Sequence, residues 1–229
     1  MKHYDFADRF RALYDKAVKL YASGQTGAGT YFTADEAAFL AANGLTAQNL
    51  YDYAEDHHDY GEPGYDRALA IELIRRDYFL NVQNGQPSAT VLDGAALPAK
   101  TDAVQGIEWL PRIIPKAKAK LRGELPPSLM YSCGGVRRFF KQHDIHPAEF
   151  LTLVWRNLDD DAATIAWVGR RSMPNKLRAG PTANARHARA PNRAPLLAIW
   201  LAPRILGSLI DYQGFPAPAD GTRRGLAAA

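Results

Sequence analysis

Apolar residues recur at helical spacing through most of the first 172 positions. In FADRFRALYDKAVKLYASG, Phe6, Phe10, Leu13 and Ala17 fall at i, i+4, i+7 and i+11. This spacing places them on one face of an α-helix, and Gly24 is a typical residue at which such a helix stops. The pattern therefore predicts an amphipathic helix at the start of the chain.

Capping signals predict where the next helices begin. Thr33 with Glu36 three residues later forms a capping box, and the helix that follows would end at Gly44. Thr46 would begin another helix, which the DYGEPGYD turn interrupts.

A fourth helix is expected over DRALAIELIRRDYFLNVQNG, with Leu69, Leu73, Ile74 and Tyr78 on its inner side. The following stretch is the least regular part of the chain, although its SATVL segment is compatible with a short strand.

Two prolines fix the start of the next helix, in GIEWLPRIIPKAKAKLRGEL. Pro111 and Pro115 are tolerated only near a helix start, where the first N–H groups lack partners anyway. The expected apolar side consists of Leu110, Ile113, Ile114, Ala117 and Leu121. The KAKAKLR run alternates charge with alanine, so its lysines would spread around the helix. This predicts a solvated face, with a phosphate-contacting face as the alternative.

Three further helical segments complete the pattern. VRRFFKQH follows a Gly-Gly step, Pro147 opens a helix at its first position, and DDDAATIAWVGRR carries its acids at the positive helix end. We therefore predict an all-α protein, with a single compact helical domain of about seven or eight helices. Its predicted parts are an N-terminal helical part (1–104), a second helical part (105–172) and an irregular basic C-terminal tail (173–229).

Composition sets the tail apart from the rest of the chain. Of the 57 residues from 173 to 229, 32 are Ala, Pro, Arg or Gly. Residues 170–229 contain ten Lys or Arg and two acids, a net charge of +8. Because the net charge of the whole chain is +4, residues 1–169 carry a net charge of −4. A poorly ordered tail is the first interpretation. There are two alternatives. The tail could be the product of a GC-rich gene read out of frame, or it could be a basic arm that binds RNA or a membrane.

Several classes of protein are disfavoured. The absence of an 18-residue apolar run predicts no membrane span, and the acidic N-terminus lacks the apolar region of a secretory signal. A single cysteine allows neither an internal disulfide nor a cysteine-cluster metal site. Glu55 and His58 have the i, i+3 spacing of helical metal ligands, but no second such pair accompanies them. We expect a cytoplasmic protein without a metal, and the sequence leaves any cofactor unknown.

The segment MYSCGGVRRFFKQHDIHP concentrates residues that can carry chemistry. Gly134 and Gly135 can adopt φ > 0 and bring bare N–H groups close to a ligand. Together with the guanidiniums of Arg137 and Arg138 at a helix start, they predict a site for a carboxylate or phosphate. The alternative is an ordinary turn whose arginines pair with nearby acids, at Asp144 or in the DDD run.

Reactive groups flank this predicted anion site. A helix N-terminus and arginines favour the thiolate form of Cys133, which would then be a nucleophile. His143 or His146 could act as a base near neutral pH, and Tyr131 adds a phenolic donor. In the alternative interpretation, Cys133 is a small buried apolar residue and His146 only caps a helix.

Residues 105–170 combine several recurring elements: the LPR entry at 110–112, the helix that follows it, the aromatic-Cys-Gly-Gly turn, the RFF run, the His-x-Ile-His-Pro junction and the closing DD…WV helix. In these elements the segment resembles a bacterial domain-of-unknown-function family, the one numbered 5069. This chain has Val136 where the family commonly has an acidic residue. The resemblance implies a small helical bacterial domain and brings no established activity, cofactor or catalytic residue.

Three functions are compatible with the sequence. The first is a small-molecule enzyme whose anionic substrate is held by the Gly-Gly/Arg-Arg turn, with Cys133 or His143 as its reactive group. The second is a non-catalytic helical module that binds a protein partner, another copy of itself or a small ligand, for which many tyrosines would be suited. The third, nucleic-acid binding, is the least favoured because it depends on the basic tail alone.

Overall fold

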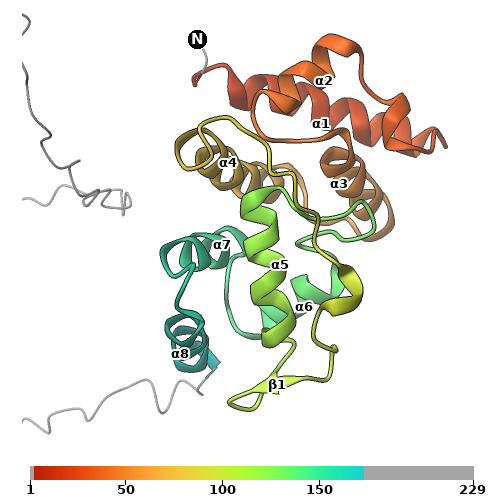
Figure 1. Cartoon of the computed structure of the whole chain (residues 1–229). Helices are drawn as coiled ribbons and strands as arrows, with labels where there is room; N and C mark the ends of the chain where they lie inside the picture. The colour runs from red at the N-terminus through yellow and green to blue at the C-terminus, as the bar shows by residue number, and fades with distance from the viewer. Residues whose placement is uncertain (1–2, 173–229) are drawn as a thin grey trace, which may run out of the picture. The chain divides into compact units, whose positions relative to one another are not determined.

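The computed structural model describes residues 3–172 (Figure 1). These residues are mainly α-helical, which confirms the predicted all-α class. The α-helices are α1 (Phe6–Ala22), α2 (Ala34–Ala41), α3 (Ala47–Tyr60), α4 (Tyr65–Asn81), α5 (Leu110–Arg122), α6 (Gly134–Gln142), α7 (Pro147–Arg156) and α8 (Asp161–Ser172). The predicted tail and its three interpretations lie outside the described residues.

The predicted capping signals form as expected. Thr33 Oγ1 accepts a hydrogen bond from the Glu36 N–H, and a Glu36 carboxylate oxygen accepts one from the Thr33 N–H at 2.8 Å. Thr46 makes the same reciprocal pair of bonds with Asn49. These bonds satisfy N–H groups that a helix start leaves without partners, so α2 and α3 begin where the sequence predicts.

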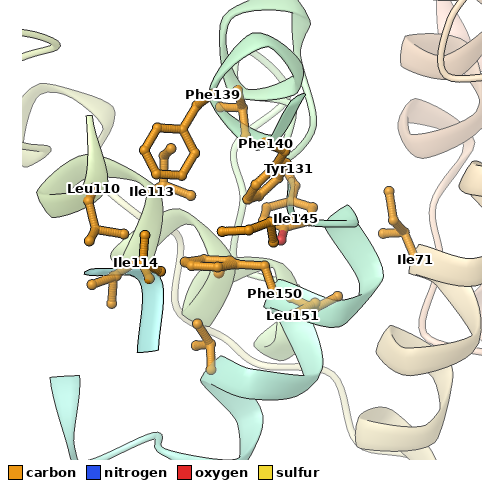
Figure 2. Close-up of a cluster of buried hydrophobic side chains, with 14 of the residues drawn as sticks. Ile71, Leu110, Ile113, Ile114, Tyr131, Phe139, Phe140, Ile145, Phe150 and Leu151 are labelled. Atoms are coloured by element: carbon orange, nitrogen blue, oxygen red, sulfur yellow. The ribbon is translucent and has the colours of Figure 1, made fainter. Parts of the chain in front are cut away.

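The apolar side chains form two clusters. The first lies mainly among α1, α2 and α3, where α1 packs against α3. The second lies among α4, α5, α6 and α7, and Figure 2 shows aromatic side chains from α6 and α7 meeting the aliphatic side chains of α5. Helix α5 places all five of its predicted apolar residues in this second cluster.

The predicted inner side of α4 is wrong in one important respect. Leu73 is 43% exposed, whereas Glu72, Arg75 and Arg76 are buried. These charged side chains are tolerated inside because they are bonded, as with Arg75, which donates to the backbone carbonyl of Leu121 at 2.8 Å. Hydropathy alone cannot anticipate such a face.

The predicted solvated face of KAKAKLR is also wrong. Lys116 and Lys120 are both buried, while Lys118 forms an ion pair with Asp161 at the start of α8. Lys120 lies 2.6 Å from the fully buried carboxylate of Glu72. Positions 116 and 120 are four residues apart and therefore share one face of α5, which here is the inner face.

A short ribbon precedes α5. Strands β1 (Ala103–Val104) and β2 (Ile107–Glu108) pair antiparallel, whereas the SATVL segment forms no strand. Two short 3-10 helices, η1 (Ala28–Thr30) and η2 (Gly94–Ala96), lie in connecting loops. The ribbon leads directly into Trp109 at the start of α5. No helix within residues 3–172 is long and apolar enough to cross a membrane.

Candidate functional site

The Gly-Gly step forms the first turn of α6 and does not precede it. Gly134 and Gly135 are the first two residues of the helix, and neither adopts the positive φ that their sequence would allow. A glycine is nevertheless needed at position 135, because a Cβ there would lie 2.8 Å from ring carbon Cζ3 of Trp109. At position 134 the nearest atom would be the guanidinium of Arg137, at 3.8 Å.

Cys133 occupies the N-cap position of α6. Its backbone is extended, with φ −65° and ψ 166°, and no side chain caps this helix. The first N–H groups of a helix have no intrahelical acceptor, so this end carries partial positive charge. The cysteine side chain is half-buried rather than enclosed in the core.

Lys116 of α5 points at this cysteine. Its Nζ lies 3.7 Å from Cys133 Sγ, and the residue is only 3% exposed. Among the described residues no carboxylate pairs with Lys116, and the thiol is the hydrogen-bond partner that the structure gives it. A buried ammonium without a counter-ion is costly, which makes this pair unlike the satisfied Lys120–Glu72 pair one turn further along α5.

Burial lowers the pKa of Lys116 below its ordinary value. A thiolate at Cys133 opposes this shift through its charge and its hydrogen bond, whereas the positive charges of Arg112 and Lys100 add to it. The lysine is thus an amine that gives up its proton more readily than a solvated one, next to a thiol that can supply one.

Two other cations act on Lys116 through their charge. Arg112 donates from Nη1 to the backbone carbonyl of Pro98 at 2.7 Å, and the Lys100 ammonium lies 5.7 Å from the ring centroid of Trp109. Across residues 3–172 neither of them forms an ion pair with a carboxylate. Because Trp109 also lies against Gly135, these positive charges are close to the start of α6, an environment that suits an anion or a thiolate.

The two arginines of α6 do not converge on this environment. Arg137 is buried and bonds to Asp56 of α3 at 2.5 Å and to the Ser132 carbonyl at 2.7 Å, while Arg138 is exposed. The expected pair of guanidiniums is therefore divided between the interior and the surface. The actual partner of Arg137 is Asp56, and not the acids at 144 or 159–161 that the sequence analysis considered.

Tyr131 lies in the second core cluster. Its hydroxyl donates to the backbone carbonyl of Pro147 at 2.9 Å, and its ring packs against Phe140. Burial raises the pKa of Tyr131 well above its ordinary value. Its position ties the loop before α6 to the start of α7.

His143 ends α6 and contacts α8. Its Nδ1 lies 2.7 Å from Ser172 Oγ, while that hydroxyl donates to the Val168 carbonyl at 2.9 Å. A hydroxyl has a single proton, so His143 donates from Nδ1 when that proton goes to Val168. Burial lowers the pKa of His143, which favours the neutral imidazole. Its ring is tilted against that of Phe139, with the centroids 4.4 Å apart.

His146 caps α7, as one interpretation of the sequence proposed. Its Nδ1 accepts a hydrogen bond from the Ala148 N–H at 3.2 Å. Burial lowers the pKa of His146, the charge of Arg67 lowers it further, and Glu149 raises it. In the part of the chain that the structure describes, no hydrogen bond joins either histidine of the segment to Cys133.

Sequence reasoning missed the lysine of this site. The alternation of charged residues and alanine around Lys116 predicts that its side chain faces solvent. A helical projection would have placed it with Ile113 and Lys120, on the buried side. Nothing in the sequence indicates that a thiol would be its partner.

Glu55 and His58, whose spacing resembles that of helical metal ligands, are joined by no further ligand within the described part of the chain. Within residues 3–172 no group of three or more His, Cys, Asp or Glu residues could hold a metal ion. In comparisons with known proteins, no family model, no curated protein and no solved structure matches the chain.

Proposed function

We propose that the protein is a thiol-dependent enzyme that acts on a small anionic molecule, with Cys133 as the nucleophile and Lys116 as the acceptor of its proton. The observation that carries this proposal is the direction of Lys116, a buried amine whose hydrogen-bond partner is Cys133 Sγ at 3.7 Å. A lysine buried only for packing would more commonly meet a carboxylate, as Lys120 does.

The first chemical step is a proton transfer within the pair. The thiol of Cys133 gives its proton to the neutral amine of Lys116, which produces a thiolate and an ammonium with no change in total charge. The positive helix end and the ammonium both stabilise the thiolate. The thiolate then forms a bond to an electrophilic carbon of the substrate, and the leaving group departs with the electron pair of the bond that breaks.

The substrate anion would be held by the same positive environment. Arg112 and Lys100 supply cationic donors, and the amides of Gly134 and Gly135 supply neutral ones. The glycines keep the anion-binding role expected from sequence. The cations of the proposed anion site are Arg112 of α5 and Lys100 of the loop before it, in place of the two arginines of α6.

Two alkylating reagents test the nucleophile and the anion site together. Iodoacetate and iodoacetamide both form a C–S bond at a thiolate and release iodide, but only iodoacetate carries a carboxylate. Relative to free cysteine, we expect native Cys133 to prefer iodoacetate by about tenfold, the value of one charge-assisted hydrogen bond. Arg112→Gln should reduce this preference, and Lys118→Gln, on the same helix but paired with Asp161, should leave it unchanged.

The outcomes separate the two parts of the proposal. A native protein in which Cys133 resists both reagents at neutral pH would exclude a catalytic thiol. Alkylation without any preference for iodoacetate would exclude the anionic substrate and leave the nucleophile.

The other two functions have weaker support. Of the tyrosines that suited an interaction module (51, 53, 60, 65 and 78), Tyr60 is the exposed one and the others are buried or half-buried. The nucleic-acid function depends on residues 173–229, which lie outside the described part of the chain. The resemblance to the family numbered 5069 supports membership of that family and a bacterial origin, and the cytoplasmic location expected from the sequence is part of the same proposal.

A further inference from the structure

A second cluster of charged side chains lies on a different side of α6. It is a pocket of about 320 Å³ at the end of α6 and the start of α7. Cys133 and Lys116 are not among its lining residues, which are Arg67, Arg137, Phe140, Lys141, Asp144, Ile145, His146 and Pro147. An inference about this pocket is therefore independent of the proposed thiol chemistry.

Three cations of the pocket share one carboxylate. Glu62 lies 2.9 Å from Arg67 Nη1, 2.7 Å from Lys141 Nζ and 3.5 Å from Arg137 Nε. Each of these side chains has several N–H donors, and a single carboxylate cannot satisfy all of them. The cluster keeps donors for a further acceptor.

One of these donors is buried without an acceptor. Arg137 is 5% exposed, and its Nη1 is used by Asp56 and the Ser132 carbonyl, yet its Nε has no hydrogen-bond partner among residues 3–172. The distance from Nε to Glu62 corresponds to an ion pair and is too long for a good hydrogen bond. Buried donors in native proteins are nearly always satisfied, so this one indicates a missing acceptor.

The charges around the pocket define the kind of acceptor. The three cations are balanced by Glu62, by Asp56 behind Arg137 and by Asp144 in the lining. After these charges are balanced, the N-terminus of α7 still contributes a partial positive charge. Such a site accommodates a single negative charge, whereas a phosphate dianion would be repelled by Asp144.

We propose that this pocket binds the carboxylate group of a small organic acid. The carboxylate bonds to Arg67, Arg137 and Lys141, and the apolar part of the molecule lies against Ile145 and Pro147. The bidentate geometry of a guanidinium matches a carboxylate, and the apolar lining accommodates a ring or a short chain.

Benzoate titrations of the full chain test this proposal by nuclear magnetic resonance. The Arg137 Nε–H is buried and gives a direct resonance for the proposed contact. We expect benzoate to shift this resonance and the amides at the start of α7, and benzamide, its neutral analogue, to leave them unshifted. Arg67→Gln and Lys141→Gln should each weaken benzoate binding by about tenfold, which corresponds to the loss of one charged hydrogen bond.

Arg138→Gln is the matched control, because it removes the same charge from the exposed side of the same helix. We expect it to change benzoate affinity by less than about twofold, as for a surface charge. Equal weakening by Arg138→Gln and Arg67→Gln would overturn the proposal, since the attraction would then be nonspecific. It would also be overturned by equal shifts with benzamide, by tighter binding of inorganic phosphate than of benzoate, or by no shift at these resonances.

Discussion

The indole of Trp109 lies against the first turn of α6, in the space that any side chain at position 135 would need. Trp109 itself has a positive φ of 69°, a conformation that is rare for a bulky residue. The close contact between Trp109 and Gly135 therefore fixes the start of α6, and with it Cys133, relative to the start of α5.

Gly135→Ala should destabilise the protein by about 1–3 kcal/mol, because the new methyl group overlaps the indole ring. Urea unfolding measures this change. Gly134→Ala is the matched control, since its methyl group would meet only ordinary contacts and should change stability by less than about 1 kcal/mol. Equal losses for the two variants would show that Trp109 does not fill this space.

The buried ion pair between Lys120 and Glu72 gives a second prediction. Lys120→Met should cost about 3–5 kcal/mol, because it leaves the Glu72 carboxylate buried with Tyr53 as its remaining donor. In Glu72→Gln the Tyr53 hydroxyl keeps an acceptor, and the Glu72→Gln/Lys120→Met double variant should lose less than Lys120→Met alone. Additive losses in this double-mutant cycle would contradict direct coupling of the two charges.

Asp52 gives a prediction for pH dependence. Burial raises the pKa of Asp52 to about 6, although a hydrogen bond from Gln48 and the charge of Lys120 oppose the shift. Since the folded state favours the protonated carboxyl, the stability that this group contributes is complete below its ordinary pKa of 3.8 and is lost as the pH rises through about 6.

Asp52→Asn should therefore stabilise the protein by about 3 kcal/mol near pH 8, where the native carboxylate is charged, and give no gain below about pH 4. Urea unfolding at these two pH values measures the difference. A gain of the same size at both would mean that ionisation of Asp52 is not its cause.

The helices were predictable because their signals are local. The capping box of Thr33 and Glu36, the proline at position 147 and the apolar residues of α5 each identify an element without knowledge of the rest of the chain. Their boundaries in the structure follow these signals closely.

Charged residues on inner faces were not predictable in the same way. Glu72 and Lys120 lie 48 residues apart in the chain, and each looks solvent-exposed until its partner is known. The same holds for Arg137 with Asp56, 81 residues away. Burial of such groups depends on tertiary pairing, which hydropathy and periodicity do not contain.

Only the local part of the candidate site was predictable, because its remaining residue depends on tertiary packing. The segment from 130 to 147 identified Cys133 and the glycines, whose placement at a helix start follows from local sequence. The partner amine comes from Lys116 on another helix, and its direction depends on how α5 packs against α6.

The central claim is that Lys116 accepts the proton of Cys133, and the rate at which iodoacetamide alkylates Cys133 tests it most directly. Cys133 is the one cysteine of the chain, so the reagent reports on this thiol alone. We expect the rate to fall markedly in Lys116→Met, which fills the same space without a proton acceptor. Equal rates in the wild type and in a folded Lys116→Met variant would contradict this claim.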